Sequence, residues 1–205
     1  MQLNVTQTEC KRCGKCCTAG GPVLHSEDRD LIVSGKLNPK DLITFRRGEV
    51  AFDPVKNSIT VIGQELIKIK GAGKIGACKF YHEDKGCTIY AFRPLECRLL
   101  RCWDTSELQA IYMKDLLKRL DLVPQGSVLY ELIVKHEDAF DLNRIAAGLN
   151  DEKDIEGKYK AINHIAEQES GFRDSVIVHY NMRVDELDFF FGRQVREVLS
   201  FLLDN

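Results

Sequence analysis

Hydrophobic residues in the second half of the chain recur at spacings of three and four, the period of an amphipathic α-helix. In the first such run, Leu108, Ile111 and Tyr112 would share one face of a helix that Ser106 begins. Runs with this pattern cover about residues 106–120, 128–149, 151–166 and 184–202. The pattern therefore predicts an all-helical region over residues 105–205.

The first half mixes helical and strand-like patterns. Ser26 and its acidic neighbours predict a helix to about Ser34, and Asn38-Pro39 predicts a second short helix through Phe45. Residues 49–70 contain short runs rich in β-branched residues, separated by turn formers, which are typical of two or three antiparallel strands. We therefore predict an α+β fold with a small antiparallel sheet in residues 1–104, on which the helical region packs.

Composition and charge narrow the class of protein. The chain has 205 residues, of which 44% are hydrophobic and 29% are charged, as in ordinary globular proteins. A net charge of −2 provides no basic surface for nucleic acid or an anionic membrane. The start has no signal-peptide pattern, and no stretch approaches the roughly 18 apolar residues of a membrane span. We therefore expect a cytoplasmic protein that binds neither nucleic acid nor a membrane.

Cysteine is the residue type that carries the candidate chemistry. Thiolates are soft ligands that select zinc, Cu(I) or iron–sulfur clusters, and reducing compartments keep them free. Four disulfides are the alternative, but adjacent cysteines would be awkward to pair separately in a short loop. Residues 1–104 are therefore predicted to form a cysteine-rich metal-binding domain, with eight candidate ligands: Cys10, Cys13, Cys16, Cys17, Cys78, Cys87, Cys97 and Cys102.

The spacing of the first cysteines distinguishes between kinds of metal centre. Cys10, Cys13 and Cys16 form two overlapping Cys-x2-Cys units, so three thiols come from one loop. Zinc ribbons use two separate pairs, whereas bacterial ferredoxin loops supply three ligands of a [4Fe–4S] cluster in this way. Cys17 would reach a second metal or cap the site from the other side. Eight thiols can serve one centre or two.

Three other residues accompany the second cysteine group. His82 lies between Cys78 and Cys87 and is the best non-cysteine ligand candidate. Arg93 and Arg98 flank Cys97, where a guanidinium would offset the negative charge of metal-bound thiolates and contribute to cofactor binding. Surface salt bridges are the alternative role for both arginines.

Residues 71–76 spell a GxGxxG pattern after a strand-like run. This pattern indicates dinucleotide binding only where a helix follows. Here Ala77 and Cys78 follow, so the glycines are better interpreted as positions that let backbone segments approach closely.

The full cysteine arrangement resembles a known bacterial family. Cys10-x2-Cys13-x2-Cys16-Cys17, then Cys78, then Cys87-Thr-Ile-Tyr leading to Arg93-Pro-x2-Cys97-Arg98 is similar to the YkgJ-type CxxCxxCC proteins, zinc- or iron-chelating domains. The resemblance covers roughly residues 10–102 and implies metal binding through these cysteines. A related cluster occurs in flagellin lysine methylases, where an iron–sulfur centre accompanies methyl transfer.

Three functions follow as hypotheses. The first is a [4Fe–4S] iron–sulfur protein for electron transfer or redox sensing, with a redox or protein partner. The second is a zinc-chelating structural protein whose helical half is an interaction module. The third is a cluster-dependent, methylase-like enzyme with a pocket lined by His82, Arg93 and Arg98.

Overall fold

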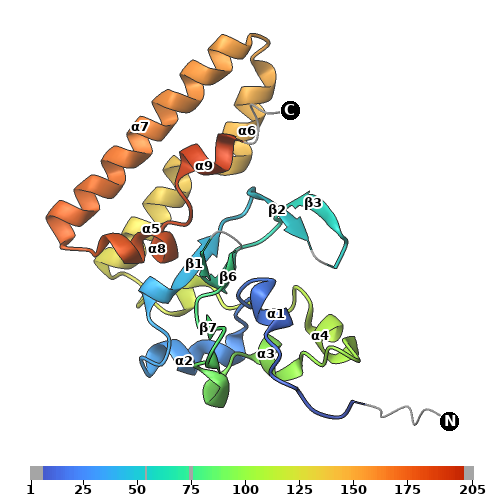
Figure 1. The fold of residues 1–205 in the computed structure, drawn as a ribbon. Coiled ribbons are helices and arrows are strands. Elements are labelled where there is room, and N and C mark those ends of the chain that lie inside the picture. Colours follow the sequence, from blue (N-terminus) through green and yellow to red (C-terminus); the bar gives the residue numbers. More distant parts are fainter. Residues whose placement is uncertain (1–6, 54, 74–75, 201–205) are drawn as a thin grey trace. The chain divides into compact units, whose positions relative to one another are not determined.

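The chain forms two compact units, each built from two stretches that are separated in the sequence (Figure 1). The computed structural model describes residues 7–53, 55–73 and 76–200. One unit, the cysteine unit, comprises Met1–Lys36 and Lys68–Leu117, and the other, the helical unit, comprises Leu37–Ile67 and Lys118–Asn205. The division predicted from the sequence, a cysteine-rich domain over residues 1–104 and a helical region over residues 105–205, stays a prediction.

The cysteine unit consists of short elements around a small core. Its helices are α1 (Lys15–Thr18), α2 (Arg29–Val33), α3 (Leu95–Leu99) and α4 (Ser106–Ile111), with 3-10 turns η1 (Ser26–Asp28) and η3 (Tyr90–Phe92). Two antiparallel pairs join β5 (Gly71–Ala72) to β6 (Ala77–Cys78) and β7 (Tyr81–His82) to β8 (Gly86–Cys87). The buried apolar side chains include Leu24, Ile69, Ile89, Leu116 and Leu117. Elements this short have little stability alone, so side-chain contacts must hold them in place.

The helical unit contains the long helices. These are α5 (Val128–Ala139), α6 (Leu142–Asp151) and α7 (Ile155–Tyr180), followed by η5 (Val184–Glu186), α8 (Leu187–Phe190) and α9 (Val195–Ser200). Before them come η2 (Pro39–Asp41), β1 (Leu42–Phe45), the antiparallel hairpin β2 (Val50–Asp53) and β3 (Ser58–Val61), and η4 (Arg119–Asp121). β1 pairs with β4 (Leu66–Ile69), in which the chain passes back into the cysteine unit.

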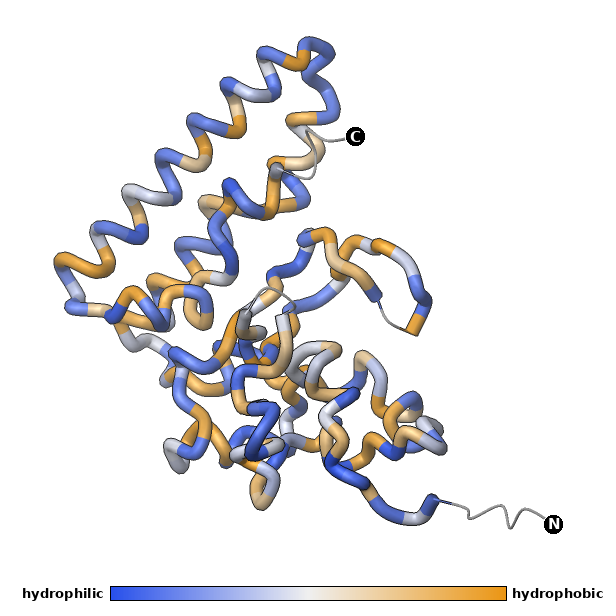
Figure 2. The backbone as a smooth tube through the Cα atoms, viewed as in Figure 1, coloured by the Kyte–Doolittle hydropathy of each residue, from blue (hydrophilic) through white to orange (hydrophobic). Residues whose placement is uncertain are grey.

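Local sequence explains where these helices begin and which faces they bury. Ser127, Asp141 and Asp154 precede α5, α6 and α7, and each side chain accepts a hydrogen bond from a backbone N–H of the first turn. Figure 2 shows hydrophobic and hydrophilic positions alternating along α7. The apolar faces meet in one cluster, formed by Phe140, Leu142, Leu149, Ile162, Val195, Val198 and Leu199. The predicted fold class, small antiparallel sheets followed by a helical part, is confirmed.

A network of charged side chains is also buried in the helical unit. His136 is fully buried, and Arg46 Nη1 donates to its Nδ1 at 3.1 Å. Because a guanidinium only donates, the ring proton must be on Nε2, which lies 3.1 Å from Glu169 Oε1. Arg173 donates to the same Glu169 oxygen, and its Nη2 donates to the Gly192 carbonyl at 2.8 Å. These contacts join Arg46, which directly follows β1, and helices α5 and α7 to the segment before α9.

The helix predicted from Asn38 to Phe45 is wrong beyond its first turn. Pro39–Asp41 form a 3-10 turn, in which the Asp41 side chain accepts from Asn38 N at 3.3 Å. Leu42 to Phe45 then form strand β1, in which buried and half-buried residues alternate. The β-branched pair Ile43-Thr44 suits a strand, and Thr44 is buried with its hydroxyl donating to the Phe189 carbonyl.

Two other predicted helices are shorter than expected. The helix from Ser106 ends at Ile111, because Met113 and Asp115 adopt positive φ angles of 58° and 47°. The run from Val184 is interrupted after Phe190, where Gly192 has a φ of 74° and its carbonyl accepts from Arg173. Hydrophobic spacing alone does not reveal these interruptions, since the apolar residues beyond them are still buried.

Candidate metal centre

Five of the eight thiols lie close enough to influence one another's ionisation. Cys97 interacts electrostatically with Cys78, Cys17, Cys87 and Cys16. We call these five cysteines the central thiol group. They come from four elements of the cysteine unit: two from α1 and one each from β6, β8 and α3. The two ends of the cysteine pattern, far apart in sequence, therefore lie within electrostatic range of each other.

Burial and mutual repulsion oppose the charged form of these thiols. The pKa of Cys17 is raised to about 12, first by burial and then by the negative charge of Cys16 and a hydrogen bond with it. Burial, followed by the charges of neighbouring thiolates, also raises the pKa of Cys97. A thiolate-binding cation would remove this penalty, because it supplies the positive charge that the group lacks. The donor set therefore fits a soft metal.

The remaining three cysteines lie at the surface. Cys10, Cys13 and Cys102 are exposed. The Cys10 sulfur accepts from Arg12 N at 3.4 Å, and the Cys102 sulfur accepts from Gln7 Nε2 at 3.6 Å. The charges of Cys87 and Cys16 raise the pKa of Cys78, and no such effect comes from these three exposed cysteines. Their role as ligands stays a prediction.

The sulfur atoms are not already gathered around a single point. Cys16 Sγ and Cys17 Sγ are 4.0 Å apart. Across residues 7–53, 55–73 and 76–200, no group of three or more cysteine, histidine or carboxylate side chains is placed to hold one metal ion. Among the described residues, the central thiol group is therefore not a closed tetrahedral site.

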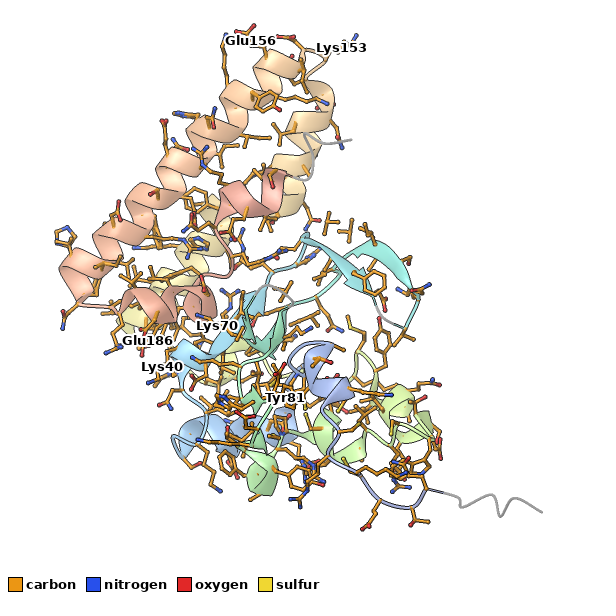
Figure 3. The ribbon with its side chains drawn as sticks, in the orientation of Figure 1. Lys40, Lys70, Tyr81, Lys153, Glu156 and Glu186 are labelled. Carbon is orange, nitrogen blue, oxygen red and sulfur yellow. The ribbon has the colours of Figure 1, made fainter. Side chains whose placement is uncertain are left out.

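Two tyrosines hold the first cysteine loop in place. Gly14, with a φ of 77°, precedes α1 and is packed so closely against Tyr81 that an added Cβ would lie 2.1 Å from the tyrosine oxygen. The Tyr81 side chain is labelled in Figure 3. The Arg12 guanidinium lies over the Tyr90 ring at 4.1 Å from its centroid, a cation–π contact. Sequence reasoning missed both contacts, although Tyr90 belongs to the motif that leads to Arg93.

The arginines that flank Cys97 contact carbonyl and carboxylate oxygens. Arg93 donates to the carbonyls of Cys97 and Tyr90 at 3.2 and 3.0 Å, and its guanidinium also lies over the Tyr90 ring. Arg98 forms an ion pair with Glu27 at 2.6 Å. His82 is exposed on β7. A cofactor-binding role for the arginines and a ligand role for His82 stay predictions.

The GxGxxG segment forms part of the same unit. Gly71 pairs with Cys78, and a Cβ on Gly71 would lie 2.7 Å from the Gly76 carbonyl oxygen. Residues 74 and 75 lie outside the described residues, and strand β6, not a helix, follows Gly76. These glycines therefore allow close approach of two backbone segments, as the sequence interpretation expected, and the helix that a dinucleotide site needs is replaced by a strand.

A cysteine-rich fold with small antiparallel sheets and convergent thiols defines the class of metal-binding cysteine-cluster domains. The model of the CxxCxxCC family, described as "Putative zinc- or iron-chelating domain", matches residues 9–115, just over half of the chain. The chain belongs to this family, and the resemblance noted in the sequence is confirmed. Searches of curated proteins and of solved structures gave no match. Among the described residues, no helix is long and apolar enough to cross a membrane.

Proposed function

We propose that the chain binds a metal centre through the central thiol group, and that this centre is an iron–sulfur cluster, most simply [4Fe–4S]. The observation that carries the proposal is the convergence of Cys16, Cys17, Cys78, Cys87 and Cys97 from four elements. A [4Fe–4S] cluster takes four thiolates, so this group provides enough ligands with one to spare. The cluster would act in electron transfer or redox sensing with a protein partner in the cytoplasm.

The arrangement of the thiols is compatible with a cluster of several atoms. A tetrahedral zinc site holds every sulfur about 2.3 Å from one atom, which requires all four thiols to converge on a point. No three candidate side chains do so among the described residues, although the five thiols share one electrostatic neighbourhood. In a [4Fe–4S] cluster each thiolate binds a different iron atom, so the four sulfurs need not converge on one point.

The chain's own residues would hold and insulate such a centre. When bound, the cluster supplies a one-electron redox couple whose potential depends on hydrogen bonds to sulfur and on solvent exposure. Cys78 is buried, whereas Cys16 is exposed, so one side of the central thiol group faces solvent. A redox partner would approach that side.

Zinc chelation is the second candidate, and one distance favours it. The 4.0 Å between Cys16 Sγ and Cys17 Sγ is close to the separation of two sulfurs bound to the same zinc ion. In that case the metal would stabilise the fold of the cysteine unit, because the helices and strands of this unit are too short to be stable unless metal–sulfur bonds cross-link them.

The deciding experiment is an optical spectrum of anaerobically purified protein, with iron, sulfide and zinc assayed in the same sample. We expect a broad absorbance near about 400 nm, from sulfur-to-iron charge transfer, with matching iron and sulfide. A colourless protein with stoichiometric zinc would reject the redox function and support chelation. The Cys78→Ser/Cys97→Ser double variant should lose the metal in either case.

A further inference from the structure

Helix α3 carries Cys97 but has only five residues, Leu95–Leu99. A helix of this length is not stable by itself, so its orientation depends on contacts with the rest of the cysteine unit. Its N-cap residue is Pro94, whose side chain makes no capping hydrogen bond. The first backbone N–H groups of α3 therefore need acceptors from elsewhere in the chain.

Asp28 supplies the first of these acceptors. Its side chain is 1% exposed, and its Oδ1 accepts from Leu95 N at 2.8 Å. Its other carboxylate oxygen, Oδ2, accepts from His25 N at 3.0 Å. Asp28 thus caps α3 across 67 residues of sequence and fixes it to the segment that begins at His25. In the sequence, Asp28 appeared only as an acidic residue in the first turn of a helix.

Glu96 makes a second attachment to the same segment. Its Oε2 accepts from Val23 N at 2.7 Å, and its Oε1 lies 3.6 Å from His25 Nε2. His25 is buried and is itself oriented by a 2.8 Å hydrogen bond between its Nδ1 and the Lys114 carbonyl. The two residues before Cys97 are therefore both bound to residues 23–28.

We propose that Asp28 and Glu96 are positioning residues that hold α3 so that the Cys97 thiol stays within the central thiol group. The inference rests on the proposed function, since positioning matters only if Cys97 is a ligand. Both oxygens of Asp28 and one oxygen of Glu96 accept from backbone N–H groups, and these are the contacts that hold α3 to residues 23–28. Residues that orient metal ligands in this way contribute about tenfold to a hundredfold in metal affinity.

The test uses the full chain, reduced and free of metal, titrated with Cd²⁺ alone. Sulfur-to-cadmium absorbance counts bound thiolates, and competition with a chelator gives the affinity. We expect Asp28→Asn and Glu96→Gln each to bind Cd²⁺ about tenfold to a hundredfold more weakly and to lose the absorbance of one thiolate, as Cys97→Ser does.

Asp53→Asn is the matched control. Asp53 is also buried, and its Oδ1 accepts from Val55 N and Lys56 N at 3.0 and 3.2 Å, but it belongs to the helical unit. This variant should bind Cd²⁺ like the wild-type chain. Any general effect of removing a buried, doubly hydrogen-bonded carboxylate would appear in it as well.

A double variant separates positioning from simple destabilisation. If Asp28 acts through Cys97, adding Asp28→Asn to Cys97→Ser should cause no further loss of affinity. Wild-type affinity in both Asp28→Asn and Glu96→Gln, or losses that add to that of Cys97→Ser, would overturn the positioning role. A wild-type chain without sulfur-to-cadmium absorbance would overturn the proposed function itself, and the positioning role with it.

Discussion

Gly14 occupies a position where any side chain would collide with the Tyr81 ring. An alanine Cβ would lie 2.1 Å from the tyrosine oxygen and 2.3 Å from Cζ, far inside contact distance. We predict that Gly14→Ala lowers the metal content and the free energy of unfolding, because the Tyr81 ring, the cysteine loop or the β7–β8 turn must move. The clash should lower the free energy of unfolding by about 1–3 kcal/mol beyond the effect of backbone strain, as measured by chemical denaturation.

Gly35→Ala is the control for this prediction. Gly35 has a φ of 75°, almost the same as the 77° of Gly14, but an added Cβ would have no atom within 4 Å. Both variants carry the strain of a positive φ, about 1–2 kcal/mol, and only one carries the clash. Equal destabilisation of the two variants would show that contact with Tyr81 is unimportant.

The cysteines should differ in their importance for metal binding. Cys78 is buried within the central thiol group, while Cys102 is exposed and contacts Gln7. We predict that Cys78→Ser loses most of the bound metal and that Cys102→Ser retains it, as measured by metal analysis after anaerobic purification. Metal loss in Cys102→Ser equal to that in Cys78→Ser would mean that the outer thiols also belong to the centre.

At the scale of elements, the buried histidine network should make the stability of the helical unit depend on pH. Burial lowers the pKa of His136 to about 4 from 6.5, and the charges of Arg46 and Arg173 act in the same direction, against Glu169. Between those pH values the unfolded chain binds the proton and the folded chain does not, so stability falls as pH drops from about 6.5 to about 4. Over this pH range the free energy of unfolding should fall by about 3 kcal/mol in total.

The carboxylate partner of His136 adds to this trend. Burial alone would raise the pKa of Glu169, but the hydrogen bond from His136 and the charge of Arg173 hold it below its usual value. A carboxylate with a lowered pKa also stabilises the folded state at neutral pH and loses this effect as pH falls through its folded pKa. Acid should therefore weaken the contacts that join α5 to α7.

The His136→Gln variant tests the histidine directly. Glutamine can accept from Arg46 and donate to Glu169 without titrating, so the variant should unfold with a flatter pH profile between about pH 4 and 6.5. Its stability at neutral pH should be lower, because the ring packs against Phe140, Phe172 and Phe191. His164→Gln, at an exposed position of α7, should leave the profile unchanged. An unchanged profile in His136→Gln would assign the pH dependence to other groups.

At the scale of the whole molecule, metal binding should protect one unit more than the other. All eight cysteines belong to the cysteine unit, and a ligand stabilises the structure that binds it. We predict that metal loading slows amide hydrogen exchange in α1, β6, β8 and α3, with little change in α5, α6 and α7. Equal protection throughout both units would instead indicate that the chain unfolds as one cooperative body.

The sequence by itself determined the features that depend on local chemistry. The helical second half followed from hydrophobic spacing. Ser127, Asp141 and Asp154 mark where helices begin, because each side chain hydrogen-bonds only to a backbone N–H of the turn that follows it. The family followed from the cysteine motif, because thiols at fixed spacings are rarely needed for anything except metal or redox chemistry. The helix caps are each contained within a few consecutive residues, and the cysteine motif is read from short segments at fixed spacings.

Only the tertiary structure decided which distant residues meet. It places Cys16 and Cys17 within electrostatic range of Cys97, whereas Cys10 and Cys13 are not among the thiols that affect Cys97, although Cys10, Cys13 and Cys16 look equivalent in sequence. It also makes Asp28 the cap of a helix 67 residues away. Such contacts depend on burial and on the path of the chain between them, and neither is encoded in the spacing of the residues concerned.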